Sequence, residues 1–518
     1  MSPAEQIPET IPAAARATAM RLPDKVALIE GARSWTFAEL YGDARAVASA
    51  YLARGIGKGD VVAIWAPNCR EWILAALGAH IAGAAITPLN TRMKGMEAGD
   101  ILRRSYARLL VCTKAFMGFD YPAMIAGESL PGLAGIVRID GDGPDGWAAF
   151  VASGKGAGDP AVAAAERAVG PDDLCDIMFT SGTTGSPKGV LHSHGNVVPL
   201  FRAWAERVDL QESDRYLIAN PFFHTFGYKA GWVACLALGV TMLPMPVFDV
   251  EEMARLIETE RVSFIPGPPA IYQSLLQGLA GQKRDFSSMR VAVTGAAPVP
   301  PVLVERMRSE LGMENVVNGY GMTEFGAIAM TGKGDTPETV ANTCGYALPG
   351  VEMTCVDAAG RPVAAGETGE ILVRGRGRMI GYFENPEATT EAIDADGWLH
   401  TGDIGSIDAA GYLRITDRKK DMYISGGFNC YPAEIEKLLA AHPAIEQAAV
   451  IGVPDDRMGE VGKAFIVLRP GTDASAAAII AWARENMANY KAPRTIAFLT
   501  EFPRNAGGKV LRTALREM

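Results

Sequence analysis

The chain reads Thr180-Ser181-Gly182-Thr183-Thr184-Gly185-Ser186-Pro187-Lys188-Gly189 at one place, an unbroken run of small hydroxyl residues and glycines with one lysine. Apolar residues precede it at 177–179 and follow it at Val190-Leu191, so we expect a loop between two strands of an α/β sheet. Glycines let backbone N–H groups approach an anion closely, hydroxyls add donors, and Lys188 adds positive charge. The run therefore predicts a phosphate-binding loop.

This loop differs from the P-loop of ordinary NTPases, which has the pattern G-x-x-x-x-G-K-[ST]. Here Pro187 lies between the glycine stretch and Lys188, and Gly189 follows the lysine. A surface turn rich in small polar residues is the alternative, but ten consecutive positions in this order disfavour it.

Composition indicates a globular protein of more than one domain. The 518 residues exceed the usual domain size of about 100 to 200, and 48% of them are apolar, enough for large buried cores. The formal charge of −10, without a block rich in lysine and arginine, argues against nucleic acid as a partner. An anionic small substrate would need a locally basic pocket.

The cysteines and the N-terminus indicate a cytoplasmic protein. Seven cysteines are an odd number and never form C-x-x-C, so we expect reduced thiols and no structural zinc. Residues 1–12 carry acids and prolines where a signal peptide needs a basic start and an apolar core. Residues 72–89 are the longest weakly charged run, and we expect a buried helix, a turn at Gly83 and a strand there, not a transmembrane segment.

Hydrophobic patterning predicts an α/β fold. Short β-branched runs alternate with helical stretches through residues 23–119 and 216–311, typical of doubly wound parallel sheets. Between these, residues 141–159 are expected to form a surface excursion, and beyond about residue 342 shorter strands indicate a β-rich subdomain whose glycines at 375–381 lie in turns. We predict a large N-terminal domain, 1–419, and a small α+β C-terminal domain, 420–518.

Four further motifs follow the phosphate loop in the chain. They are Asn318-Gly319-Tyr320-Gly321-Met322-Thr323-Glu324, Thr401-Gly402-Asp403, Asp417-Arg418-Lys419-Lys420-Asp421 and Pro503-Arg504-Asn505-Ala506-Gly507-Gly508-Lys509. In order and spacing, over nearly the whole chain, they resemble the AMP-forming adenylating superfamily, which includes acyl- and aryl-CoA synthetases. The resemblance implies activation of a carboxylic acid by ATP to acyl-AMP, with release of pyrophosphate, and then transfer to coenzyme A.

The resemblance also implies a set of nucleotide-binding residues. The phosphate loop would hold the β- and γ-phosphates, Thr323 the α-phosphate, Glu324 a Mg²⁺ ion, and Asp403 with Arg418 the ribose, while Tyr320 would face the adenine ring. The complete nucleotide-binding set is Thr180, Ser181, Gly182, Thr183, Thr184, Gly185, Lys188, Gly295, Ala296, Ala297, Asn318, Gly319, Tyr320, Gly321, Met322, Asp403 and Arg418.

Further residues are implied for catalysis and for the second step. Lys509 would neutralise the carboxylate and the α-phosphate during adenylation, and Lys420 would be the hinge about which the C-terminal domain rotates. Gly426 and Gly427 would then line the tunnel for the pantetheine arm of coenzyme A, unless they form an ordinary β-turn. His224 would lie beside the acyl carboxylate, with a packed core histidine as the alternative. Lys491 lies in a recurring C-terminal motif and is given no role.

The acid itself is less well defined. The segments 222–231 and 266–276 are similar to bacterial ligases for the bicyclic indane-dione propanoate left from steroid rings, and fatty-acid ligases share much of them. We expect a short, wide acyl pocket walled by aromatic side chains, namely Phe222, Phe223, Phe226, Tyr228 and Tyr272, and the alternative is that these aromatics pack the core. The alternatives are an acyl-AMP ligase that loads a carrier protein and a nucleotide-binding regulator with a dead site. The sequence leaves open whether the protein is a monomer or a homodimer.

Overall fold

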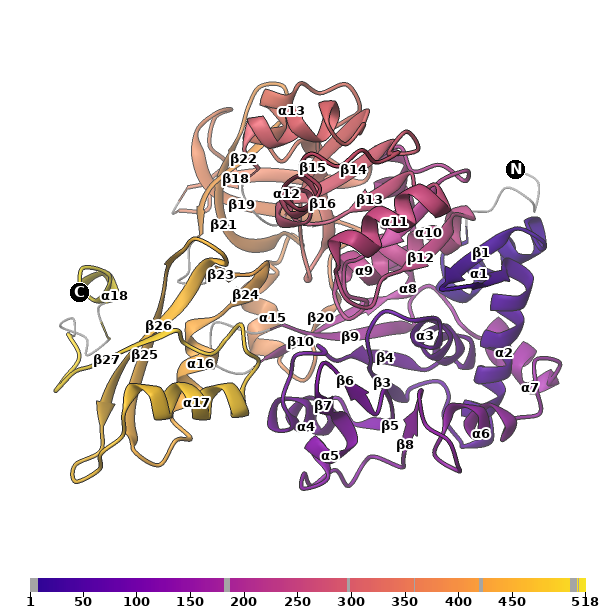
Figure 1. The fold of residues 1–518 in the computed structure, drawn as a ribbon, viewed down its shortest axis with the longest axis horizontal. Helices are drawn as coiled ribbons and strands as arrows, with labels where there is room; N and C mark the ends of the chain where they lie inside the picture. The colour runs from indigo at the N-terminus through magenta and orange to yellow at the C-terminus, as the bar shows by residue number, and fades with distance from the viewer. Residues whose placement is uncertain are drawn as a thin grey trace.

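Two mixed sheets with helices on both faces make up most of the molecule, and a smaller lobe follows them in the chain (Figure 1). The structure is a computed structural model that describes residues 8–180, 187–295, 299–357, 359–418, 423–503, 510 and 512–518. A large N-terminal domain and a small C-terminal domain result, which is the predicted α/β class. The predicted boundary, between residues 419 and 420, falls outside the described residues.

Within the described residues, the first sheet has nine strands in the order β17-β16-β15-β14-β13-β11-β12-β1-β2. Its central pairs, from β15 to β1, are parallel, and the pairs at both edges are antiparallel. The strands are β1 (Val26–Glu30), β2 (Arg33–Thr36), β11 (Arg215–Ile218), β12 (Thr241–Pro244), β13 (Phe264–Pro266), β14 (Val291–Gly295), β15 (Asn315–Met322), β16 (Gly326–Met330) and β17 (Tyr346–Ala347).

The second sheet carries the phosphate loop. Its described strands run in the order β20-β10-β9-β4-β3-β5-β8, and β10 pairs antiparallel with both of its neighbours. The strands are β3 (Val61–Trp65), β4 (Ala85–Pro88), β5 (Ala107–Cys112), β8 (Ile136–Arg138), β9 (Leu174–Thr180), β10 (Lys188–Ser193) and β20 (Gly381–Tyr382). A two-stranded ribbon, β6 (Ala115–Phe116) and β7 (Phe119–Asp120), lies beside it.

Two further sheets, mainly antiparallel, follow in the chain. The β-rich subdomain has β18 (Val351–Val356), β19 (Thr368–Gly375), β21 (Leu399–Ile407) and β22 (Leu413–Arg418). The C-terminal domain has β23 (Tyr423–Ser425), β24 (Phe428–Cys430), β25 (Ile445–Asp455), β26 (Gly459–Leu468) and β27 (Thr495–Phe498), and β27 pairs parallel with β26.

Helices cover the faces of these sheets (Figure 1). In the N-terminal domain they are α1 (Ile11–Arg21), α2 (Phe37–Ala53), α3 (Arg70–Ala82), α4 (Gly95–Arg104), α5 (Tyr121–Ile125), α6 (Trp147–Ala152), α7 (Pro160–Arg167), α8 (His194–Arg207), α9 (Thr225–Gly227), the π-helix η2 (Tyr228–Val233), α10 (Ala234–Leu238), α11 (Val250–Glu260), α12 (Pro269–Gly278), α13 (Pro301–Ser309), α14 (Pro337–Asn342) and α15 (Pro386–Ala392). The C-terminal domain adds α16 (Pro432–Leu439), α17 (Ala476–Asn486) and α18 (Arg512–Arg516).

Local sequence signals explain where several helices begin and end. Thr36 and Glu39 form a capping box that starts α2, and Gly83 ends α3 in the left-handed conformation at φ 88°. Residues 72–82 of α3 are buried throughout, so the expectation of a helix, a turn at Gly83 and a strand is confirmed. No helix in the described part of the chain is long and apolar enough to cross a membrane.

One short helix was not predicted, although residues 141–159 are mostly exposed or partly exposed, as expected for a surface excursion. Residues 141–159 contain α6, whose Phe150 is fully buried and packs on Tyr51 with 5.1 Å between ring centroids. The glycine- and aspartate-rich residues around the helix obscured it, because a six-residue helix has too few apolar positions to show a period.

Candidate active site

A hairpin presents the phosphate loop. β9 and β10 pair antiparallel up to Thr180 and Lys188, and the Thr180 Oγ1 hydroxyl donates to the Lys188 carbonyl over 3.4 Å. Arg104 of α4 braces its base, since one guanidinium N–H donates to the Pro187 carbonyl over 2.7 Å and the group lies 5.2 Å from the centre of the Phe179 ring. Residues 181–186, with Ser181 to Gly185 of the predicted set, lie outside the described residues.

Lys188 and Glu324 are brought together through Tyr382. The Lys188 ammonium lies 4.8 Å from the centre of the Tyr382 ring, and the Tyr382 hydroxyl donates to Glu324 Oε1 over 3.0 Å. Strand β20 fixes this arrangement by pairing Tyr382 with Val190, and the Met379 amide donates to the Glu324 carbonyl over 2.8 Å. Three segments distant in sequence therefore meet at the base of the phosphate loop.

The Glu324 carboxylate lies in a deep, partly accessible position. Burial raises its pKa above the ordinary range, although Tyr382 and Lys188 act in the opposite direction and Asp403 adds to the increase. A carboxylate under this penalty gains from a nearby cation. A Mg²⁺ ion fits this donor, since magnesium is held by one or two carboxylates together with phosphate oxygens. No group of three or more metal-ligating side chains occurs among the described residues, so phosphate oxygens would have to complete the shell.

Tyr382 was not predicted. The glycines at 375–381 are predicted to lie in turns, whereas the last of them, Gly381, begins β20, which pairs with β10. A tyrosine directly after Gly381, with Phe383 behind it, was the available signal for a short strand.

Tyr320 and Asp403 form a second pair. The Tyr320 hydroxyl donates to Asp403 Oδ2 over 2.5 Å, and both residues are nearly buried, with 7% and 9% of their surface exposed. Asp403 of β21 is paired in register with Arg418 of β22. Three residues of the predicted nucleotide set are therefore neighbours, because Tyr320 bonds to Asp403 and the backbone of Arg418 lies opposite Asp403.

Two strands of the large sheet approach closely at Gly295 and Gly319. These residues are paired across β14 and β15, and a Cβ atom on Gly295 would lie 2.6 Å from the Gly319 carbonyl oxygen. Asn318 is tied to the protein itself, because its side-chain amide donates to the Val340 and Thr343 carbonyls, each over 2.9 Å. Gly321, Met322 and Thr323 follow towards Glu324 at the accessible end of β15, and Ala296 and Ala297 lie outside the described residues.

His224 caps the short helix α9. Its Nδ1 accepts from the Phe226 amide over 3.3 Å, which leaves the proton of the neutral ring on Nε2. The side chain is reached by solvent, yet protein surrounds it closely enough that desolvation lowers its pKa. His224 is therefore an accessible, neutral hydrogen-bond donor and not a packed core histidine.

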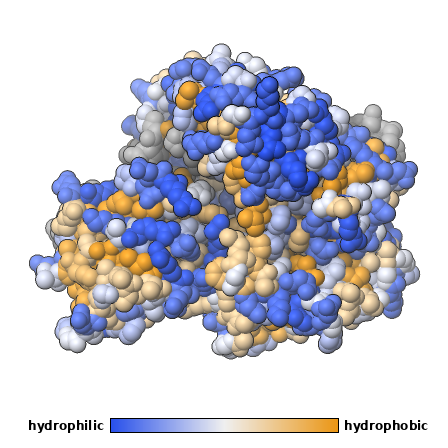
Figure 2. All heavy atoms as spheres, in the orientation of Figure 1, coloured by the Kyte–Doolittle hydropathy of each residue, from blue (hydrophilic) through white to orange (hydrophobic). Residues whose placement is uncertain are grey.

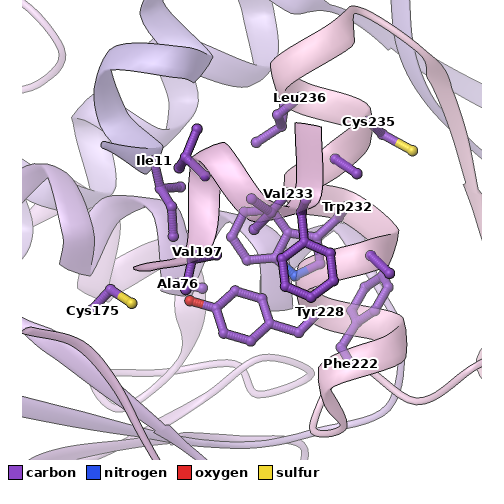
Figure 3. Packing of buried hydrophobic residues seen from close by; sticks show 14 of the residues in the cluster. Ile11, Ala76, Cys175, Val197, Phe222, Tyr228, Trp232, Val233, Cys235 and Leu236 are labelled. Atoms are coloured by element: carbon purple, nitrogen blue, oxygen red, sulfur yellow. The ribbon is translucent and has the colours of Figure 1, made fainter. Parts of the chain in front are cut away.

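The expected aromatic wall is only partly present. Phe222 and Tyr228 pack against Trp72 at 5.4 and 6.0 Å between ring centroids, inside the core cluster of Figure 3. Tyr272 is buried as well and donates to the Ile265 carbonyl over 2.8 Å. Phe223 and Phe226 alone of the five aromatics keep intermediate exposure. The prediction that all five line a pocket is wrong, because sequence proximity to His224 does not tell which way alternate side chains point.

Gly426 and Gly427 form the turn between β23 and β24. Both have positive φ, 58° and 83°, and the flanking residues Ser425 and Phe428 pair directly, as in a tight hairpin. The hairpin faces the N-terminal domain, whereas α18 lies at the outer edge of the C-terminal domain (Figure 1). Tyr431, just beyond the hairpin, is close enough to affect the pKa of Tyr382, which burial and Glu324 raise far above its usual range. Lys420 and Lys509 lie outside the described residues.

Comparison with known proteins agrees with this geometry. Residues 15–383 match the model of the AMP-binding enzyme family, and residues 434–509 match that of the AMP-binding enzyme C-terminal domain. The chain belongs to the AMP-binding enzyme family and is an acyl-CoA ligase by class.

One curated relative is 3-[(3aS,4S,7aS)-7a-methyl-1,5-dioxo-octahydro-1H-inden-4-yl]propanoyl:CoA ligase from Mycobacterium tuberculosis. It is 50% identical, with 98% of this chain and 99% of the relative covered. A solved structure of o-succinylbenzoate CoA synthetase from Bacillus subtilis, bound with its product analogue, has 30% identity and a TM-score of 0.83 over 98% of both chains. ATP-bound MatB from Rhodopseudomonas palustris, with the same identity and coverage, has a TM-score of 0.71.

Proposed function

We propose that this protein activates a bicyclic, steroid-derived propanoate with ATP and transfers it to coenzyme A. The observation that carries the proposal is that Lys188, Tyr382 and Glu324 meet beside the Tyr320–Asp403 pair. Lys188 belongs to the phosphate loop, and Glu324 is a carboxylate whose burial favours a nearby cation. Asp403 is a carboxylate that can accept hydrogen bonds from hydroxyl groups. The likeness to the indane-dione propanoate ligase supports the choice of acid.

The first step joins two anions and therefore needs positive charge. In the proposed site the phosphate loop and Lys188 hold the β- and γ-phosphates, Thr323 holds the α-phosphate, and Lys509 lies between the acid and that phosphate. Mg²⁺ held by Glu324 would neutralise phosphate charge as pyrophosphate departs. The acid's carboxylate oxygen forms a bond to the α-phosphorus, and the bond to the leaving pyrophosphate breaks.

Other residues hold the substrates in place. Asp403 accepts from the ribose hydroxyls, with Arg418 beside it, while the glycines at 295, 319 and 321, with Asn318, Met322, Ala296 and Ala297, shape the adenine side. The neutral His224, with its proton on Nε2, donates to the acyl carboxylate. Tyr382 holds Glu324 by its hydroxyl, so Tyr382→Phe should raise the ATP concentration needed for half-maximal rate.

The second step needs a different domain arrangement. We propose the domains 1–419 and 420–518, a hinge at Lys420, and passage of the pantetheine arm along Gly426 and Gly427. The hairpin with Gly426 and Gly427 faces the N-terminal domain, whereas α18, which follows the segment with Lys509 in the chain, lies at the outer edge (Figure 1). This geometry supports assigning the described arrangement to the second step.

Release of AMP and formation of the thioester test the proposal directly. Purified protein is given ATP, Mg²⁺, coenzyme A and one of three acids: the indane-dione propanoate, octanoate or palmitate. We expect the highest kcat/KM for the bicyclic acid, because fused rings bury apolar area without immobilising many rotors. A preference for palmitate would contradict the proposed acid substrate but would leave the proposed ligase reaction in place. Acyl-AMP without any thioester would favour loading of a carrier protein.

Lys509→Ala separates the two steps. It should abolish most acyl-AMP formation and leave conversion of synthetic acyl-AMP to thioester intact, and equal loss of both would contradict the role given to Lys509. We also propose a cytoplasmic location, which the seven cysteines, all free in the structure, support. Sedimentation of the purified protein distinguishes a monomer from a homodimer.

A further inference from the structure

A buried lysine joins the two domains. Lys491 of the C-terminal domain, 2% exposed, lies 2.8 Å from Oε1 of Glu97 on α4 of the N-terminal domain. It also lies 2.7 Å from Oε1 of Glu434 on α16 of its own domain. Glu97 and Glu434 are 8% and 4% exposed. One ammonium and two carboxylates are therefore enclosed where the domains meet. Figure 2 shows the surface of the two domains on one face, with a hollow between the C-terminal lobe and the rest of the molecule.

Neighbouring contacts make Glu97 the centre of this junction. Its second oxygen, Oε2, accepts from the Ala488 amide over 3.1 Å, and the Tyr490 hydroxyl accepts from the Asn90 side-chain amide over 3.2 Å. Both contacts also cross between the domains. The junction thus fixes the segment 488–491 against the segment 90–97.

The junction leads directly to the hairpin that faces the active site. The Tyr490 ring stacks on Phe428 with 4.5 Å between centroids and 21° between planes, and the Arg92 guanidinium lies 5.5 Å from the centre of the Phe428 ring. Phe428 is the residue after Gly427. A contact that holds Tyr490 therefore also holds the Gly426–Gly427 turn on the side that faces the N-terminal domain.

The charges of the junction depend on the domain arrangement. Burial alone disfavours the Lys491 ammonium, but Glu434 and Glu97 more than offset it and raise the pKa of Lys491 well above its ordinary value. When the domains separate, water replaces these contacts, so the net energy of the junction is modest and it can open. Loss of one charge in the closed arrangement is costly, since a buried ion is then left with an unbalanced partner.

We propose that Glu97 and Lys491 form a latch that holds the C-terminal domain in the arrangement used for thioester formation. They are positioning residues, because they act through Tyr490 and the glycine hairpin and do not touch the reacting atoms. The inference rests on the proposed function, since it assigns the described arrangement to the second of two steps. A latch that favours one arrangement should promote that step by shifting its population.

Glu97→Gln is the sharpest single change. Glutamine keeps the oxygen that accepts from the Lys94 amide at the start of α4, and it leaves the Lys491–Glu434 pair intact within the C-terminal domain. The rate of acyl-AMP formation, measured as pyrophosphate release in a single turnover, should stay within about twofold of wild type. Conversion of synthetic acyl-AMP and coenzyme A to thioester should fall by about 10- to 100-fold. Glu128→Gln is the matched control, because it breaks an ion pair with Arg103, at the end of α4, within one domain and should change neither step.

A charge exchange tests the pairing itself. Glu97→Lys and Lys491→Glu should each impair thioester formation. The double variant should recover much of it, because the ammonium, moved to the α4 side of the junction, would again face two carboxylates. Recovery would not follow if either residue served only to fold its own domain. The latch is refuted if Glu97→Gln changes both steps equally or neither, or if the exchange restores nothing. Failure of the proposed function is distinct, since wild-type protein would then form no acyl-AMP from any of the three acids.

Discussion

Among the residues that the structure describes, two lysines are almost completely buried, and they differ in what surrounds them. Lys229 of η2, 1% exposed, lies 3.0 Å from Asp176 of β9 and 3.0 Å from Nδ1 of His192 on β10. All three belong to the N-terminal domain, next to the strands that carry the phosphate loop. Lys491 has equally short contacts, but one of its two carboxylates belongs to the other domain.

In our proposal, the same kind of ion pair serves as a fixed part of the core at Lys229 and as a contact that opens at Lys491. Around Lys229 nothing can separate without unfolding the sheet, and the pair joins η2, which follows His224, to the hairpin of the phosphate loop. Burial by itself would raise the pKa of Asp176, but Lys229 and His192 more than offset it and lower that pKa, so the carboxylate stays charged. Around Lys491 the proposed domain movement would expose all three charges to water. The predictions below compare the two sites in order of decreasing effect.

Lys229→Met should have the largest effect on stability. The change leaves Asp176 buried without its cation and should lower the free energy of unfolding by about 3 to 5 kcal/mol. Urea denaturation followed by tryptophan fluorescence measures this, since Trp72 and Trp232 pack in the same core. Lys333→Met, which removes an exposed ion pair with Asp209, is the control and should cost less than about 1 kcal/mol. Equal losses in the two variants would contradict a special role for the Lys229 pair.

Acid should weaken the core before it weakens the latch. Burial lowers the pKa of His80 to about 4, and this histidine lies beside Tyr228, His194, Asp176 and Lys229. Because its folded pKa is below the unfolded value of about 6.5, its contribution is complete above that pH and is lost as the pH falls. We expect a loss of roughly 2 kcal/mol between pH 7 and pH 5.

The contribution of Lys491 to stability depends on pH in the opposite direction. The raised pKa of Lys491 means that its contribution is present below about pH 10.4 and is lost only at higher pH. Urea denaturation of wild type and His80→Gln at both pH values checks the comparison. Between pH 7 and pH 5 the free energy of unfolding should fall less in His80→Gln than in wild type. An equal fall in the two proteins would refute the assignment to His80.

Removing both charges at the Lys229 site should cost less than removing one. The double variant Lys229→Met with Asp176→Asn leaves no buried ion of this pair, so we expect it to unfold with a free energy about 1 to 2 kcal/mol below wild type. The two single variants and the double complete a cycle. A strictly additive result would show that the ions do not interact.

Glu97→Gln should have the smallest effect on stability, a loss of less than about 1 kcal/mol. The glutamine can still cap α4, and Lys491 keeps Glu434. Trp482, on α17, reports on the C-terminal domain in the same denaturation experiment. A loss as large as that of Lys229→Met would show that Glu97 belongs to a fixed core and would remove the contrast between the two sites.

Patterns in the sequence predicted most of the elements near the site. The strands on both sides of the phosphate loop are confirmed. The alternation of strands and helices expected through residues 216–311 is confirmed by elements such as α11 and β14. Glu324, Asp403 and Tyr320 were predicted through motifs whose residue types match the chemistry. The roles of Tyr382 and Lys229 were not predicted, because each depends on a partner that is distant in the chain, Glu324 for Tyr382 and Asp176 for Lys229.

The sequence by itself determined the fold class, the phosphate loop and the identities of the charged residues, since hydrophobic period and local motif are properties of neighbouring residues. Tertiary structure alone decided which aromatics are buried, that Tyr382 joins Lys188 to Glu324, and that Lys491 meets Glu97 across 394 positions of chain. Burial is the physical reason. The contribution of a charged group or an aromatic ring to stability depends on the side chains that exclude water around it. Those side chains come together only when the chain folds.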